Sequence, residues 1–234
     1  MLFGLDLSSP LFWSAFGSIV LANIVLSGDN AIVIAMAART LKAEQRSKAI
    51  FWGSAAAIVM RIVLTIVAIQ LLALPYLKII GAVLLFYIGV DLLQTEQDSD
   101  GEGREINGMM AAIRTILIAD LVMSLDNVLA VAAAAKGNVP LLVLGLLVSI
   151  PLIVFGATLL TKVMERFPVI ITMGAALLGF LAGEMLLTDP AAVTHFGTIS
   201  ERAVTFGGMV GAVVVVALGT CLSKRAQTTS SNSI

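Results

Sequence analysis

A polar motif occurs twice within apolar surroundings, as NIVLSGDN at residues 23–30 and as DLVMSLDN at residues 120–127. The similarity continues past the motif, where Ala35, Ala37 and Ala38 align with Ala132, Ala134 and Ala135. Identical polar residues inside two apolar segments are hard to obtain from composition alone. We therefore interpret the two copies as an internal repeat.

The composition indicates the solvent around these motifs. The 234-residue chain is 59% hydrophobic and only 12% charged, with a mean hydropathy of +1.04. A soluble domain carries charge on about a quarter of its residues. The composition therefore excludes an ordinary cytosolic enzyme, a disordered chain and a nucleic-acid-binding protein, and it is typical of a polytopic membrane protein.

Seven apolar segments are long enough to cross a hydrocarbon core, which takes about 20 helical residues. They cover residues 11–38, 47–73, 76–94, 110–135, 140–161, 168–187 and 203–222. The alternating pattern of a membrane barrel is absent, and backbone groups in lipid must pair within their own segment. We predict an all-α fold with seven transmembrane helices, in a single transmembrane domain over residues 1–234.

The third and sixth segments also align, with GAVLL at 81–85 matching GAALL at 174–178 and Asp91 matching Glu184. Each repeat holds three spans, so the second begins on the opposite side of the membrane, as in many secondary transporters. We predict inverted repeats over 11–94 and 110–188, an acidic cytoplasmic linker over 95–109, a seventh helix over 203–222, and a disordered polar tail over 223–234.

The Lys and Arg residues predict the orientation, because short cytoplasmic loops carry the excess of positive charge. With the N-terminus outside, the inner side holds Arg39, Lys42, Arg46, Lys48, Arg104, Arg114, Lys162, Arg166, Lys224 and Arg225, and the outer side holds Lys78, Lys136 and Arg202. This asymmetry predicts a multi-pass protein of the cell membrane with a cytoplasmic C-terminus.

Five carboxylates lie within the predicted spans: Asp29, Asp91, Asp120, Asp126 and Glu184. A charged side chain near the bilayer centre costs at least about 2.5–3.5 kcal/mol, so these residues are expected to have a function. Asp91 and Glu184 lie near the ends of their spans, and the other three lie deeper.

Helical spacing places polar residues on one stripe in each motif, Asn23, Ser27 and Asn30 in the first and Asp120, Ser124 and Asn127 in the second. On a regular helix Asp29 and Asp126 lie about 100° away from these stripes. We expect Gly28 to break the first helix and turn Asp29 toward its stripe. Leu125 holds the equivalent position in the second copy, so the break is expected only in the first.

Facing each other, the two motif helices would offer carboxylate, amide and hydroxyl oxygens. Such oxygens suit hard divalent ions, Mn²⁺, Mg²⁺ or Ca²⁺, whereas Zn²⁺ and Cu⁺ sites recruit His or Cys. His195 lies in an outer loop, and the ten Met residues are interpreted as packing filler. We assign to the metal site Asp29, Asn30, Asp126, Asn127, Asp120, Asn23, Asp91 and Glu184. The ion would be a transported substrate, and no permanently bound cofactor is expected.

Arg61 is the one basic residue that lies deep inside a predicted span, away from its ends. We expect it to act as a counter-charge to Asp29, Asp91 or Asp120, either as a mobile group in transport or as a static buried ion pair. Gly207, Gly208 and Gly211 would allow close helix contact, with another helix of the same chain or with a second protomer in a homodimer.

The motifs at residues 27–31 and 124–128, SGDNA and SLDNV, resemble those of the TerC family of bacterial integral membrane proteins. The resemblance covers residues 12–221, and it matches Asp29, Asn30, Asp126 and Asn127 to the acidic motif of the family. It implies the lysine-exporter superfamily, Mn²⁺ export by several members, and supply of metal to extracytosolic enzymes or secretion machinery by some.

The leading hypothesis is Mn²⁺ efflux by alternating access, with Asp91 admitting the ion on the inner side and Glu184 releasing it outside. The direction of transport comes from the resemblance alone. One alternative is an organic-cation or amino-acid exporter in which Arg61 anchors a carboxylate. Another is an intramembrane aspartyl protease, which needs two carboxyls sharing a proton. Duplicated Asp-Asn motifs and the lack of a Gly-x-Gly-Asp motif disfavour the protease.

Overall fold

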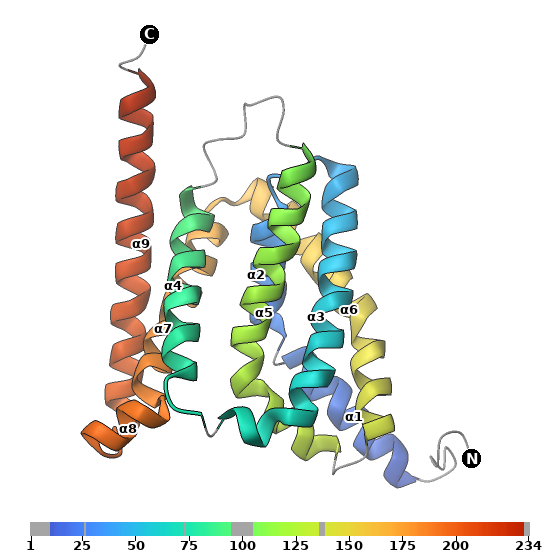
Figure 1. Cartoon of the computed structure of the whole chain (residues 1–234). Coiled ribbons are helices and arrows are strands. Elements are labelled where there is room, and N and C mark those ends of the chain that lie inside the picture. Colours follow the sequence, from blue (N-terminus) through green and yellow to red (C-terminus); the bar gives the residue numbers. More distant parts are fainter. Residues whose placement is uncertain (1–9, 26, 73, 95–104, 136–138, 232–234) are drawn as a thin grey trace.

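A computed structural model describes residues 10–25, 27–72, 74–94, 105–135 and 139–231. Every regular element in these ranges is a helix, as predicted. The helices are α1 (Pro10–Val25), α2 (Gly28–Ala38), α3 (Ala43–Leu72), α4 (Leu77–Gln94), α5 (Glu105–Ala135), α6 (Val139–Arg166), α7 (Val169–Thr188), α8 (Pro190–Phe196) and α9 (Glu201–Ser231) (Figure 1).

The helices α3, α4, α5, α6, α7 and α9 are long and apolar enough to cross a membrane. The pair α1 and α2 makes a seventh span when its two pieces, which meet at a bend of 45°, are counted together. This count confirms an all-α membrane protein with up to seven spans among the described residues.

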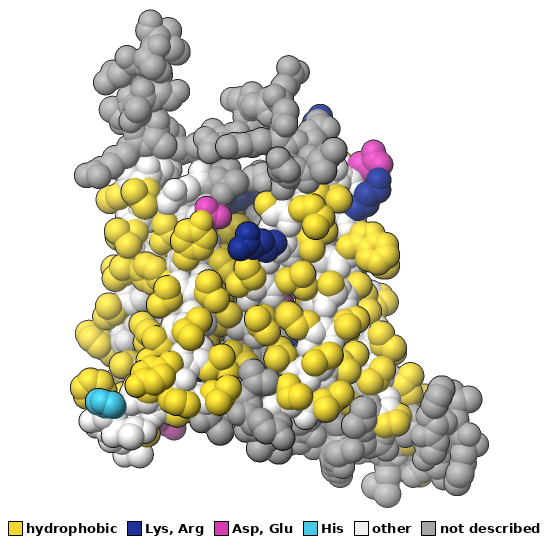
Figure 2. All heavy atoms as spheres, in the orientation of Figure 1, with side chains coloured by type: hydrophobic (Ala, Val, Ile, Leu, Met, Phe, Trp, Pro, Cys, Tyr) yellow, Lys and Arg dark blue, Asp and Glu magenta, His cyan; other side chains and the backbone are white. Residues whose placement is uncertain are grey.

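The outer surface of the bundle is apolar. Large hydrophobic side chains point outward along several helices; Phe155 is 70% exposed and Val213 is 68% exposed. Figure 2 shows hydrophobic side chains over the middle of one face, with Lys and Arg side chains in its upper part. Exposing such a surface to water is unfavourable, whereas contact with the hydrocarbon tails of lipids is favourable.

The first motif interrupts its helix and the second does not. α1 ends at Val25 and α2 begins at Gly28, whereas α5 runs through residues 120–127 without a break. The prediction of a break at Gly28 in the first copy only is confirmed. In the first turn of α2, the backbone amide of Asn30 donates to Oδ1 of Asp29 (2.8 Å).

The motif helices lie inside the bundle. α2 contacts α3, α5, α6 and α7, and α5 contacts both α1 and α2; Figure 1 shows α2 and α5 in its centre. The third and sixth predicted spans, α4 and α7, are also in contact, and so are the second and fifth, α3 and α6. These are contacts that an inverted repeat would make, and the repeat itself stays a prediction from the sequence.

Two helices extend beyond the apolar segments predicted as their membrane spans. The helix α5 begins at Glu105, inside the linker predicted over 95–109, and residues 95–104 lie outside the described part. The polar tail was expected to be disordered, but α9 continues to Ser231. Hydropathy predicts where a helix leaves the membrane, but a helix can continue beyond that point. Lys, Arg, Ala and Gln, at residues 224–227, are good helix formers and allow α9 to continue.

The last helix packs within the chain through glycines. A Cβ at Gly183 of α7 would lie 2.2 Å from the carbonyl oxygen of Gly207, and one at Gly211 of α9 would lie 2.1 Å from that of Gly179. Small residues let membrane helices approach until their backbones touch. The sequence left open whether the α9 glycines contact another helix of the same chain or a second protomer. In the structure they contact α7 of the same chain.

Asp189, which the sequence analysis did not single out, connects two helix starts on the predicted outer side. Its fully buried carboxylate accepts hydrogen bonds from the backbone amides of Ala191 (2.7 Å), at the start of α8, and of Tyr76, Lys78 and Ile79 (3.0–3.3 Å), at the start of α4. Burial alone would raise the pKa of Asp189, but these four amides outweigh it and hold the pKa below its usual value. The Asp-Pro sequence at residues 189–190 indicates that Asp189 caps the start of α8. It does not indicate that the same carboxylate binds the start of α4.

We expect Gly183→Ala to destabilise the protein by about 1–3 kcal/mol, since the added methyl group would overlap a backbone carbonyl. Gly156→Ala, on α6, is the matched control because, apart from its chain neighbours and the backbone of its own helix, nothing lies within 4 Å of the point where its methyl group would stand. Thermal unfolding in detergent compares the two variants. Equal melting temperatures would contradict the α7–α9 contact.

We expect Asp189→Asn to lower stability by about 1–3 kcal/mol at pH 7, because the charge is removed and the amide NH2 that replaces one carboxylate oxygen cannot accept the hydrogen bonds made there. The pKa of Asp189 is lower in the folded state, so the ionised carboxylate stabilises the fold above the ordinary Asp pKa of about 4. The difference between wild type and variant should shrink as the pH falls below that value. Melting curves in detergent at pH 7 and at acidic pH measure it, and a difference independent of pH would count against the charged cap.

Candidate functional site

A buried guanidinium joins the two motif helices. Arg61 of α3 is 2% exposed. Its Nη1 donates to Asn23 Oδ1 (2.7 Å) and to Ser27 Oγ (2.9 Å), on the first motif. Its Nε donates to Ser124 Oγ (3.0 Å), and its Nη2 forms an ion pair with Asp120, both on the second motif. The two motifs thus meet around one positive charge.

This network explains the polar stripes in part. The hydroxyl of Ser27 donates to Asn23 (3.3 Å) and that of Ser124 donates to Asp120 (3.3 Å), so each stripe is also linked along its own helix. Of the three acids considered as partners of Arg61, the structure pairs it with Asp120. The side chains of Asn23 and Asp120, assigned to the metal site from the sequence, therefore bind a guanidinium.

A separate cavity of about 60 Å³ collects other predicted ligands. Asp29 at the start of α2, Asn127 of α5 and Glu184 of α7 line it. The remaining lining residues are Leu85, Met123, Leu181 and Met185. The cavity combines an acid from the first motif, an amide from the second, and the acid of the sixth predicted span.

Two carboxylates and an amide suit a divalent cation. A pair of carboxylates balances two positive charges, and carboxylate and carbonyl oxygens are the preferred ligands of hard metal ions. Apolar side chains complete the wall, so a bound ion would exchange water for protein oxygens. The arrangement can hold one small cation between elements of both predicted repeats.

The other assigned residues lie elsewhere. Asn30 is buried, and neither of its side-chain amide atoms has a hydrogen-bond partner among the described residues. Asp91 is exposed near the end of α4 and does not line the cavity. The side chain of Asp126 lies outside the described residues. Among the side chains that are described, no three of His, Cys, Asp or Glu group closely enough to hold a metal ion by themselves.

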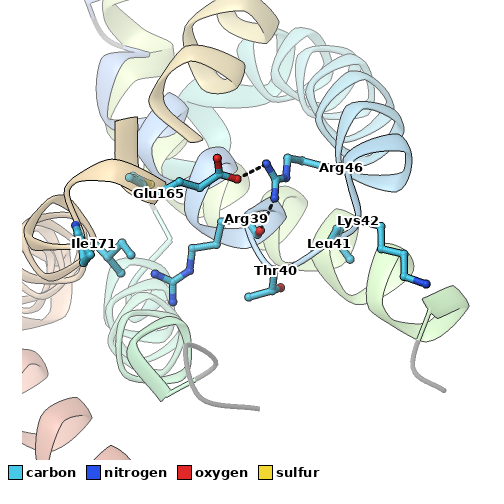
Figure 3. A pocket seen from close by; sticks show the side chains of 9 residues that line it. Arg39, Thr40, Leu41, Lys42, Arg46, Glu165 and Ile171 are labelled. Carbon is cyan, nitrogen blue, oxygen red and sulfur yellow. Dashed lines mark hydrogen bonds and ion pairs between the residues drawn. The ribbon is translucent and has the colours of Figure 1, made fainter. Parts of the chain in front are cut away.

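A second cavity, of about 360 Å³, opens on the predicted inner side, between the α2–α3 and α6–α7 corners. Arg46 pairs with Glu165 across it and donates to the backbone oxygen of Arg39 (2.8 Å) (Figure 3). Arg39 in turn donates to the backbone oxygen of Leu92 (2.8 Å). In the sequence these two arginines indicated only the cytoplasmic side. In the structure Arg46 joins α3 to α6, and Arg39 joins the end of α2 to α4.

The sequence from residue 8 to residue 230 matches the model of the family described as "Integral membrane protein TerC family". The chain belongs to the TerC family. The family assignment confirms the resemblance carried by the doubled Ser-x-Asp-Asn motif, and it covers all seven predicted spans.

Relatives of the chain are bacterial membrane proteins. It is 44% identical over 171 residues to "Uncharacterized membrane protein YjbE" of Bacillus subtilis, covering 73% of this chain and 78% of that one. It is 27% identical to "Uncharacterized membrane protein YceF" of the same organism (79% and 75% covered). It is 24% identical to "UPF0053 inner membrane protein YgdQ" of Escherichia coli (69% and 75%). No solved structure matches the chain.

We expect Arg61→Leu or Asp120→Leu alone to destabilise the protein by about 3–5 kcal/mol, because each leaves a buried charge unpaired. The double variant should lose much less stability than the sum of the losses in the two single variants. Melting temperatures of the four proteins in detergent form a double-mutant cycle. The exposed pair Lys48–Glu44 (2.8 Å) is the control, for which we expect little coupling. Additive losses at Arg61 and Asp120 would contradict the pair.

Proposed function

We propose that the protein is a divalent metal cation transporter that exports Mn²⁺ across the bacterial plasma membrane by alternating access. The observation that carries the proposal is the cavity lined by Asp29, Asn127 and Glu184. It lies among apolar membrane helices, where carboxylates are costly and a bound cation would compensate their charge. Family membership supports a transport role, and Mn²⁺ and the outward direction rest on the resemblance.

The roles of the individual residues follow from their positions. Asp29 and Glu184 supply the charge, and Asn127 supplies an amide oxygen. We propose Asp126 as a further ligand from its place beside Asn127 in the motif. Buried amide groups without a partner favour a ligand that satisfies them, which supports a role for Asn30.

Two features support movement between outward- and inward-facing states. The break before Gly28 gives the first span a bend of 45° next to Asp29. On the predicted inner side, the Arg46–Glu165 ion pair joins α3 to α6, which belong to different repeats. We propose that this pair holds the inner side closed and that Asp91, near the inner end of α4, receives ions when it opens. This scheme places the N-terminus outside, as the Lys and Arg residues predict.

The size of the cavity disfavours an organic substrate. Pockets for organic ligands usually enclose about 300–1,000 Å³, whereas this one has about 60 Å³. Arg61, the group that would anchor a substrate carboxylate, is already bound to both motif helices. An inorganic ion fits these observations better than an amino acid.

We expect expression in a manganese-sensitive bacterial strain to lower cellular Mn²⁺ and to raise Mn²⁺ tolerance. Asp29→Asn and Glu184→Gln should each reduce efflux by about tenfold or more, because each removes a charged ligand. Asp126→Asn is expected to act in the same way. Cellular manganese is measured by mass spectrometry at matched expression.

Glu201→Gln is the control, because it removes an exposed carboxylate at the start of α9 and should leave efflux unchanged. If wild type does not lower cellular Mn²⁺, the proposed function is wrong. If wild type does and the Asp29 and Glu184 variants are equally active, the function stands and the site assignment is wrong.

A further inference from the structure

Two methionines share the cavity with the proposed ion ligands. Met123 of α5 and Met185 of α7 line it together with Asp29, Asn127 and Glu184. Both are nearly fully buried, at 6% and 4% exposed. They come from the same two helices as Asn127 and Glu184, four residues before Asn127 and one residue after Glu184.

These positions change the interpretation of the methionines as filler. Of the methionines that the structure describes, only Met123 and Met185 line the cavity. They share the hydrophobic core with Met36 and Met164, which do not line it, and Met173 and Met209 are exposed on the outer surface. Leu85 and Leu181 already supply an apolar wall. A thioether adds what leucine lacks, a polarisable sulfur with lone pairs.

Sulfur changes which ions a site accepts. Carboxylate and amide oxygens bind Mg²⁺, Ca²⁺ and Mn²⁺ alike, whereas thioether ligands favour softer metal ions over Mg²⁺ and Ca²⁺. A cell contains far more Mg²⁺ than any transition metal, and oxygen ligands by their chemistry alone do not discriminate against Mg²⁺. A mixed set of oxygen and sulfur donors favours ions of the first transition series.

We infer that Met123 and Met185 are specificity-determining ligands that make the Asp29–Asn127–Glu184 cavity select divalent transition-metal ions over Mg²⁺ and Ca²⁺. This inference rests on the proposed transport function and names the class of ion that it serves. Both thioethers belong to the second predicted repeat. Selectivity is therefore built on α5 and α7, and the first repeat contributes the charge of Asp29.

The test uses the full-length protein reconstituted in liposomes, with Mn²⁺ transport measured in the presence of rising Mg²⁺ or Ca²⁺. Met123→Leu, Met185→Leu and the double variant keep side-chain volume, and such exchanges usually fold normally. We expect the preference of the double variant for Mn²⁺ over Mg²⁺ to be about tenfold or more weaker than that of wild type. Met173→Leu, on the exposed face of α7, is the control and should behave as wild type.

A second measurement needs only that wild type and one single variant fold. Cd²⁺ and Ca²⁺ have similar radii but differ in softness, so competition between them reports on sulfur ligands. Wild type should prefer Cd²⁺ over Ca²⁺, and either leucine variant should lose part of that preference. An unchanged preference in the variants of either experiment would overturn the inference and leave metal transport standing. Failure of wild type to transport or bind any divalent ion would overturn the proposed function and the inference with it.

Discussion

A positive charge buried in a membrane bundle must be satisfied by the protein, because lipid offers no hydrogen-bond acceptors. Arg61 meets this constraint with acceptors from both motif helices: Asn23 and Ser27 on one side, Asp120 and Ser124 on the other. Its guanidinium has a planar set of donors, which fixes the directions from which those helices approach. Electrostatics as well as packing therefore holds α5 against α3, and the hydrogen bond to Asn23 ties α1 to the same guanidinium.

This network determines which motif residues remain for a ligand. The first two residues of each polar stripe are hydrogen-bonded to Arg61. The third residue of each stripe and Asp29 are not among these partners of Arg61. The interruption before Gly28 directs Asp29 to a cavity that Asn127 and Glu184 also line. The two predicted repeats therefore do not contribute equally. The first supplies the counter-charge Arg61 and the acid Asp29, and the second supplies the remaining polar wall.

Close glycine contacts hold the frame around this site. The carbonyl-to-glycine contacts between α7 and α9 leave no room for a side chain, and they attach the last helix to the one that bears Glu184. Asp189, directly after the C-terminal end of α7, anchors that end to the start of α4. The position of Glu184 is therefore set by contacts at the end and along the length of its helix.

The sequence by itself determined that the chain is helical, that it crosses a membrane and that one motif occurs twice, because hydropathy and motif identity are local properties of the chain. It also indicated the broken helix at Gly28 and the candidate acids, since an intramembrane charge is conspicuous wherever it lies. The partner of Arg61, among three candidate acids, and the grouping of Asp29 with Glu184 were decided only by the tertiary structure. So were the positions of Met123 and Met185, because a thioether among apolar residues carries no local signal. Which residues share a cavity depends on how helices distant in sequence cross, and no spacing along a single helix contains that information.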